Sequence, residues 1–177
     1  MTLATPTGSY ATARANLAAM LAASSTFQEW VGADDATEAA AHIHLSAAPG
    51  PENGECYSKI ELDALLPMAV VWTKAFLTRP DSAVGSLAAY ARGSDLVVEL
   101  VGQVDPATET VPAECGRLFD NVVGGIVGDL EASNGTPGFL AWRQIAIAEE
   151  PERGPIQEIP TRGDLWRLQM VVSWMGL

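Results

Sequence analysis

Basic residues are scarce in this chain of 177 residues. Ten lysines and arginines stand against 22 acidic residues, which gives a formal net charge of −12, and Lys59 and Lys74 are the only lysines. Proteins that hold DNA or RNA by its phosphates need a stripe of Lys and Arg to neutralise them. The sequence has no such stripe, so we expect no sequence-specific nucleic-acid binding.

The marks of a secreted or membrane protein are also missing. The two cysteines, Cys56 and Cys115, are too few for a disulfide framework. The first residues have neither a positive flank nor a continuous apolar run before Arg14, so we expect no signal peptide and no membrane anchor. These absences favour a protein of the reducing cytoplasm.

Histidine is equally rare, and both copies, His42 and His44, stand in the stretch AHIHL, twelve residues before Cys56. A zinc site needs three or four nitrogen, sulfur or oxygen ligands. On a strand the two imidazoles would share a face, whereas on a helix they point about 200° apart. We favour the helix, and therefore predict that neither histidine is a metal ligand.

No motif for a nucleophile is complete. The stretch Gly-x-Ser-x-Gly is absent, and any serine or cysteine triad would have to recruit His42 or His44. Cys115 lies near a predicted helix N-terminus, where a thiol pKa can fall, but packing explains its position more simply. The cluster of Glu149, Glu150 and Glu152 fits a solvated loop better than a pair of catalytic carboxylates.

The glycines of VVGGIVGD, residues 122–129, imitate part of a dinucleotide-binding fingerprint. A true fingerprint opens a helix directly after a strand, whereas these glycines fall inside a predicted helix. We interpret them as packing positions, where another backbone approaches closely. The sequence therefore predicts no catalytic residue, no cofactor-binding residue and no metal ligand, and a protein that is not an enzyme.

What the sequence does contain is the pattern of a globular protein, 48% hydrophobic and 18% charged. Residues 10–31 are alanine-rich and predict a helix, broken near Ser24, with Ser25–Gln28 or Thr26–Glu29 at the spacing of a capping box for the restart. Asp35 and Glu38 cap a second predicted helix over residues 36–45, and residues 46–58 are predicted to be a loop.

Strand patterns follow. Residues 68–78 are rich in β-branched and aromatic side chains, and residues 86–104 alternate around a Gly93-Ser94 turn, which predicts a hairpin. Residues 139–149 and 164–175 predict two further strands that pair antiparallel. The connector between these two strands, residues 150–163, holds three prolines and is predicted to be an extended loop.

One clear amphipathic helix is predicted over residues 112–133, with Thr110 as a possible cap, Pro112 in the first turn and Asn134-Gly135 as the stop. One half of its wheel is apolar: Leu118, Phe119, Val122, Val123, Ile126, Val127 and Leu130. In the last strand Trp166 and Trp174 share the apolar face and are expected in the core, and partial burial is expected for Trp142.

Together these elements predict one α+β domain over residues 1–177, with a single mostly antiparallel sheet of four to five strands packed on one or two helices. The stretches LLPMAVVWTKAF, DLVVELVGQVDP, CGRLFDNVVGGIVGDL and DLWRLQMVVSWMGL resemble, in order and pattern, the tail terminator proteins of long-tailed bacteriophages. The likeness covers roughly residues 65–177 and the first helix. Residues 33–64 depart from it and are interpreted as an N-terminal helical insertion.

The resemblance implies a ring, commonly of six subunits, that caps the finished tail tube and offers the surface to which the DNA-filled head attaches. Its implied partners are further copies of the chain, the tail tube protein and the head-tail connector, in a virion assembled in the host cytoplasm. DNA passes through such a ring without being read, and an acidic wall would repel its backbone.

Three other hypotheses stay open. The chain could be a neck or connector protein, or a minor tail protein, which would differ from a terminator in its partner. From another class, it could be a small-molecule binding module or an unrecognised enzyme, with a mostly apolar pocket near Trp72, Trp142 or Trp166. The third is a bacterial scaffold protein of similar fold.

Overall fold

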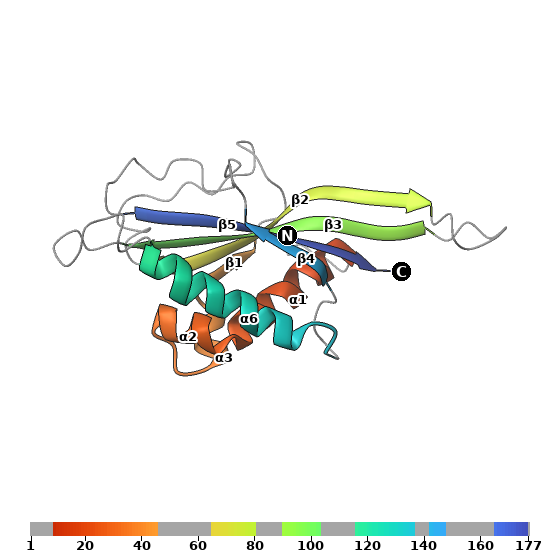
Figure 1. The fold of residues 1–177 in the computed structure, drawn as a ribbon. Helices are drawn as coiled ribbons and strands as arrows, with labels where there is room; N and C mark the ends of the chain where they lie inside the picture. The colour runs from red at the N-terminus through yellow and green to blue at the C-terminus, as the bar shows by residue number, and fades with distance from the viewer. Residues whose placement is uncertain are drawn as a thin grey trace, which may run out of the picture.

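The computed structural model describes residues 9–45, 65–80, 90–103, 116–136, 142–147 and 165–176. A single mixed sheet lies above a layer of helices, which confirms the predicted α+β class (Figure 1). The helical elements are α1 (Ser9–Ala23), α2 (Ser25–Val31), α3 (Ala36–Ala40), the π-helical turn η2 (Phe119–Val123) and α6 (Gly124–Ser133). The strands are β1 (Ile43–Leu45), β2 (Met68–Pro80), β3 (Tyr90–Gln103), β4 (Trp142–Ile147) and β5 (Leu165–Gly176).

The sheet has five strands in the order β1-β2-β3-β5-β4. All neighbours pair antiparallel except β1 and β2, which run parallel. The three long strands β2, β3 and β5 form the centre, where Val71 lies opposite Val98 and Val98 lies opposite Met170. The predicted single, mostly antiparallel sheet is therefore present, and β4 and β5 pair antiparallel as expected.

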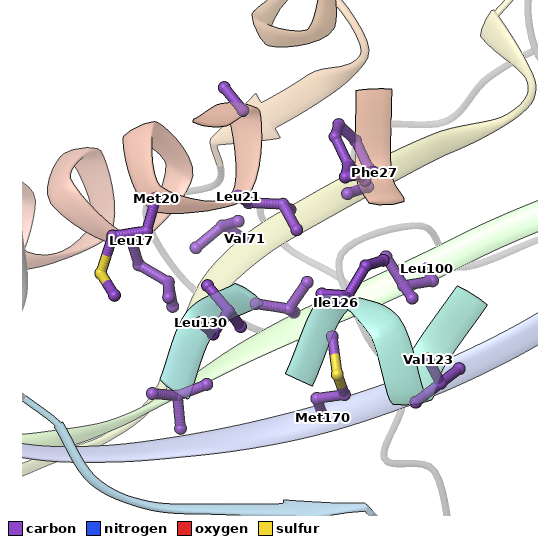
Figure 2. Packing of buried hydrophobic residues seen from close by; sticks show 14 of the residues in the cluster. Leu17, Met20, Leu21, Phe27, Val71, Leu100, Val123, Ile126, Leu130 and Met170 are labelled. Atoms are coloured by element: carbon purple, nitrogen blue, oxygen red, sulfur yellow. The ribbon is translucent and has the colours of Figure 1, made fainter. Parts of the chain in front are cut away.

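The main core lies between this sheet and the helices. Figure 2 shows side chains from α1, α2 and α6 meeting those from β2, β3 and β5. Leu17, Phe27, Ile126 and Met170 are among its fully buried members. Each such side chain contributes roughly 1.5–3 kcal/mol through its removal from water, so this layer contact is the main source of stability.

The opposite face of the central strands is buried as well. Met68, Val70 and Trp72 of β2 form a second apolar cluster with Val97 and Val101 of β3. Burial on both faces explains why these strands are nearly continuous apolar runs, because neither face needs to be polar. By contrast β5 alternates, with Trp166 and Trp174 in the core as predicted and Arg167 on the other face.

The break in the first helix falls where the sequence predicted it, but the cap is a different residue. Ser24 is the N-cap of α2, and its hydroxyl accepts a hydrogen bond from the Phe27 amide at 3.1 Å. The capping spacings that begin at Ser25 or Thr26 were therefore one or two residues too late. At the other end Gly32 adopts φ 73°, a left-handed conformation that stops the helix.

The helix expected over residues 36–45 is much shorter than predicted. Asp35 does cap it, accepting from the amides of Thr37 and Glu38 at 2.7 and 2.9 Å, but α3 ends at Ala40. Residues 43–45 form β1 instead, because they pair with β2 along the sheet edge. A strand partner distant in the sequence has overridden the local alanine-rich pattern.

The predicted hairpin over residues 86–104 is wrong. Gly93 and Ser94 lie inside the continuous strand β3, where Gly93 is opposite Leu77 of β2 and Met175 of β5. A Gly-Ser pair turns the chain only when the two flanking segments can pair with each other. Here each side of the pair already has partners on both of its edges, so the strand continues, and the strand before it is β2.

The amphipathic helix is interrupted by a π-helical turn. The helix is regular over residues 116–118, becomes η2 over Phe119–Val123 and is α-helical again in α6. A π turn inserts one extra residue, which shifts the apolar stripe by about 100°. Phe119 is consequently 45% exposed, contrary to its predicted place on the apolar face, whereas Leu118, Ile126 and Leu130 are buried.

The stop of this helix is confirmed: Asn134 is the C-cap and Gly135 has φ 74°. Trp142 is partly buried, as expected. Several predictions fall outside the described residues, namely those on Cys56 and Cys115, the helix start at Thr110 and Pro112, the loop 46–58, the acidic cluster Glu149, Glu150 and Glu152 with Arg153, and the connector 150–163.

Candidate functional site

In the described part of the chain, β1 and β4 are the outer strands of the sheet, and they are unlike each other. One end is β1, three residues that run parallel to β2, and the other is β4, six residues that run antiparallel to β5. Within the described ranges no strand lies beyond either of them. An outer strand presents one row of backbone N–H and C=O groups on its open side, which can pair with another chain.

Each outer strand also exposes one large apolar side chain. Leu45 at the end of β1 is 49% exposed and Ile147 at the end of β4 is 36% exposed. Among the residues whose side chains are described, Phe119 is the remaining exposed large hydrophobic, and it belongs to the helical layer.

The register shows that these two side chains lie on the same face of the sheet. Leu45 is opposite Val71 and Ile147 is opposite Met170, and both partners belong to the core beneath the helices. Directly opposed residues on paired strands point to the same side. Leu45 and Ile147 therefore both project toward the helical side, one at each end of the sheet (Figure 1 shows the two strands).

Charges differ between the two ends. The segment that leads into β1 carries Asp34, Asp35 and Glu38, all exposed. Hydrogen bonds from the amides of Glu38 and Thr37 hold the pKa of Asp35 below its usual range, so this carboxylate stays charged near neutral pH. On β4 the exposed charged side chain is Arg143. The described residues before β1 are therefore acidic and β4 carries a cation, although the sequence after β4 continues with Glu149, Glu150 and Glu152.

An internal polar contact holds the helical layer together. Asp129 of α6 accepts hydrogen bonds from the Ser24 hydroxyl at 2.7 Å, the Thr26 amide at 3.0 Å and the Ser25 hydroxyl at 3.3 Å. The Ser24 bond is the largest cause that lowers the pKa of Asp129. The first amides of a helix lack a partner within it, and the Asp129 carboxylate accepts from one of them, that of Thr26 in α2. Asp129 therefore has a structural role.

The glycines of residues 122–129 turn out to serve packing at one position. A Cβ atom on Gly125 would come within 2.6 Å of the Thr26 side chain, so only glycine lets α2 approach this closely. Gly124 and Gly128 have open space where a Cβ would be. The expected packing is therefore found at Gly125 alone, and the neighbour is the Thr26 side chain and not the expected backbone.

The histidines lie at the start of β1 and not on a helix. His42, in the turn before the strand, places Nδ1 2.9 Å from the carbonyl oxygen of Pro67, and His44 lies within β1. The predicted 200° separation is therefore wrong, because the helix ends before both residues. Among the described residues no group of three or more His, Cys, Asp and Glu side chains could hold a metal ion.

An ion pair with one buried partner lies on the face of the sheet opposite the helices. The Glu99 carboxylate of β3 is fully buried, and Arg167 of β5 donates to its Oε1. Burial lowers the pKa of the Arg167 guanidinium. Its neighbour pair, the Ser173 hydroxyl donating to Asp95 at 2.6 Å, continues a polar row along this face. Pattern analysis did not single out these residues, although Glu99 interrupts the apolar run LVVELV.

Two shallow grooves adjoin one another around Trp30 of α2. The larger, about 460 Å³, lies against the first helical turns after residue 116, and the smaller, about 270 Å³, reaches the end of β3. Trp30 packs edge-on against Trp166, with 6.1 Å between the ring centroids. The Trp30 ring also comes close to Gly102, where the lack of a side chain leaves room for the indole. Both grooves share Trp30, Arg117 and Leu118.

Known proteins add no guide to this arrangement. No protein-family model matches the chain, and no curated protein matches its sequence. In the part of the chain that the structure covers, no helix is long and apolar enough to span a bilayer. The functional argument therefore depends on the sheet ends, the charges and the grooves.

Proposed function

We propose that the chain is a non-enzymatic structural protein of phage virion assembly. It acts as a tail terminator does: it caps the tail tube as a ring, a hexamer by analogy, and forms the joining surface for the head. The observation that carries this proposal is the open sheet with two unlike outer strands. A ring built by head-to-tail contacts needs two different, complementary surfaces on each subunit.

The order of elements supports the same proposal. A helix at the N-terminal end, an apolar strand that follows Pro67, two further long strands and an amphipathic helix between them match the layout of the family that the sequence resembles. The interpreted insertion 33–64 is not wholly helical, because it contains β1, which is part of the sheet. The insertion would thus supply one of the two contact edges.

The net charge of −12 supports a passive role toward DNA. Acidic walls repel the phosphate backbone, so DNA would pass through the ring without adhering to it. If the acidic residues line the bore, binding to a DNA column should be undetectable at physiological salt. A ring with a strongly basic bore would contradict this part of the proposal.

The test measures the mass of the assembly and identifies the protein to which it binds. The purified chain, with and without the tail tube protein of the same phage, is analysed by native mass spectrometry and negative-stain electron microscopy. A closed ring that attaches to the end of the tube is the expected result. Attachment to the portal or its adaptor, and not to the tube, would assign the chain as a neck or connector protein instead. Binding to neither would contradict the proposal.

A second candidate function, a small-molecule binding module, is favoured by the grooves at Trp30. Arg117 and Asn121 offer polar groups beside the indole, which suits a small organic acid with an apolar body. A thermal-shift screen of such acids would test it, with Trp30→Leu and Arg117→Gln as the variants that should lose binding. A monomeric chain that binds one of these acids would favour this function over the ring.

A further inference from the structure

We propose that Asn134-Gly135 is a deamidation site, and that two hydrogen bonds to Trp142 protect Asn134 as long as β4 stays attached to the end of α6. The inference goes beyond the proposed function and does not depend on it. The chain contains two Asn-Gly pairs, Asn53-Gly54 and Asn134-Gly135, and the second lies within the described residues. Glycine after asparagine favours this reaction, because no Cβ hinders the attacking nitrogen.

The reaction begins at the backbone nitrogen of Gly135. After a base in solution removes its proton, this nitrogen attacks Cγ of Asn134, the N–Cγ bond forms, and the Cγ–Nδ2 bond breaks so that ammonia leaves. Water then opens the cyclic imide at one of its two carbonyl carbons. The product is aspartate, or isoaspartate when the main chain runs through the former side chain, and one water is consumed for each ammonia released. Asn134, Gly135 and Thr136 are exposed, so water and base reach the site.

In the folded chain the carboxamide of Asn134 is held against this attack. Its Oδ1 accepts from the Trp142 amide at 3.0 Å, and its Nδ2 donates to the Trp142 carbonyl oxygen at 3.1 Å. Closing the imide ring needs the bond from Asn134 to Gly135 nearly eclipsed with Cα–Cβ, whereas ψ 125° at Asn134 keeps the two far apart in an L residue. The attack also makes Cγ tetrahedral, which moves Oδ1 and Nδ2 out of the plane in which both bond to Trp142. The reaction therefore requires this contact to open.

Further contacts hold Trp142 in place. Its indole Nε1 donates to the Leu130 carbonyl oxygen of α6 at 3.3 Å, and its side chain packs against the main core. In the sheet Trp142 lies opposite Trp174 of β5. The protection of Asn134 thus depends on the attachment of the first residue of β4 to α6 and β5. When that attachment opens locally, the rate of deamidation is the rate in an unfolded chain multiplied by the open fraction.

Deamidation makes the opening irreversible. An ionised carboxylate accepts hydrogen bonds but cannot donate one, so the product cannot replace the bond from Nδ2 to the Trp142 carbonyl oxygen. It also places a negative charge beside that oxygen. Chains in which β4 has once detached are thereby chemically marked, and their β4 is held less firmly afterwards.

The experiment follows both Asn-Gly pairs in one sample. The full chain is incubated at neutral and mildly alkaline pH, folded in buffer and unfolded in guanidinium chloride, and its peptides are analysed by mass spectrometry for replacement of NH2 by OH. Trypsin, which cleaves after Lys and Arg, places the two pairs on separate peptides. In denaturant both pairs should react, with Asn53-Gly54 as the standard. In buffer Asn134 should react at least about tenfold more slowly than in denaturant, and isoaspartate should be among its products.

Variants of Trp142 test whether its contact provides the protection. Trp142→Phe removes the indole bond to Leu130 and keeps an aromatic ring in the core, and Trp142→Ala removes both. Asn134 should react a few-fold faster in the first variant and approach its denatured rate in the second. Gln144→Ala is the matched control, because Gln144 is an exposed residue of the same strand, and it should keep the wild-type rate. Circular dichroism verifies that each variant is folded, and Trp142→Phe decides if Trp142→Ala does not fold.

Three results would overturn the proposal. The first is an Asn134 that reacts as fast in the folded chain as in the unfolded one, or that does not react in denaturant where Asn53 does. The second is a wild-type rate in the folded Trp142 variants, since the contact would then not be the cause of the protection. The third is aspartate without isoaspartate, which would exclude attack by the Gly135 nitrogen. None of these results bears on the tail-tube binding test, so the proposed function is decided separately.

Discussion

The centre of the sheet and its two ends have opposite characters. The central strands β2 and β3 are buried on both faces and β5 on the face toward the helices, with side chains such as Trp72 and Leu100 wholly inaccessible. The outer strands β1 and β4 are short, and their terminal side chains Leu45 and Ile147 stay in water. Stability therefore depends on the centre, while the described side chains at the ends contribute little buried area. Substitutions of the same kind at the two places should separate these roles.

The largest effect is expected from one substitution made at two isoleucines. Ile126→Ala removes a fully buried side chain from the core under the sheet and should cost about 2–5 kcal/mol of unfolding free energy. Ile147→Ala, on the outer strand, should cost less than about 1 kcal/mol, because that side chain is already partly in water. Urea unfolding at one protein concentration measures both. Equal losses would contradict the comparison.

Substitutions at two arginines test the ion pair on the face of the sheet opposite the helices. Arg167→Met leaves the fully buried Glu99 carboxylate without its ion-pair partner and should cost roughly 2–3 kcal/mol, below the cost for a wholly buried pair because Arg167 is partly exposed. Arg143→Met on β4 should change stability by less than about 0.5 kcal/mol. Adding Glu99→Gln to the Arg167 variant should restore part of the loss, since the uncompensated charge is removed. No recovery in the double variant would argue against an ion-pair role.

Substitution of Gly125 and of Gly128 in α6 by alanine should change the stability of the protein in opposite directions. Gly125→Ala would drive a Cβ into the Thr26 side chain and should destabilise the protein by about 1–2 kcal/mol. Gly128→Ala meets open space and should stabilise it by up to about 1 kcal/mol through helix propensity. Thermal unfolding followed by circular dichroism compares them. The glycine interpretation fails if both variants are stabilised alike.

The smallest effect is expected at Asp129, and it should depend on pH. Asp129→Asn weakens three hydrogen bonds at the start of α2 and should cost about 1 kcal/mol near neutral pH, discounted because the carboxylate is partly exposed. Its folded pKa lies below the ordinary 3.8, so its stabilisation is present above that value and is lost as the pH falls through the folded pKa. Unfolding free energies of wild type and variant should therefore converge in acid. A constant difference down to about pH 2 would exclude the charge as the cause.

Local patterns predicted the central strands β2 and β5 and the outer strand β4, but not the outer strand β1. The alternation of Trp166 to Trp174 and the apolar run from Met68 located β5 and β2, because burial on one or both faces leaves a direct mark in the sequence. The strand β1 was missed, since a three-residue strand has no period of its own and exists only through its partner β2. The turn at Gly93-Ser94 was wrongly predicted for the same reason, as pairing with distant strands outweighs a local turn signal.

The candidate site was harder to predict than the fold. Leu45 and Ile147 are ordinary apolar residues at the ends of short segments, and nothing local separates them from core positions. Their significance comes from exposure combined with the strand order, and both require the assembled sheet. The exposed Phe119 was assigned to the core because the π turn that rotates it outward breaks the 3.6-residue period on which the assignment depended.

The single parallel pair, β1 with β2, has a consequence for the polarity of any assembly. Five strands that alternated throughout would begin and end in the same direction, and successive subunits could then extend the sheet only through a parallel ladder, with its slanted and slightly weaker bonds. Reversing one three-residue strand makes the terminal strands point opposite ways. In any assembly that extended the sheet between copies of the same orientation, the direction of this short strand would therefore make the joining ladder antiparallel.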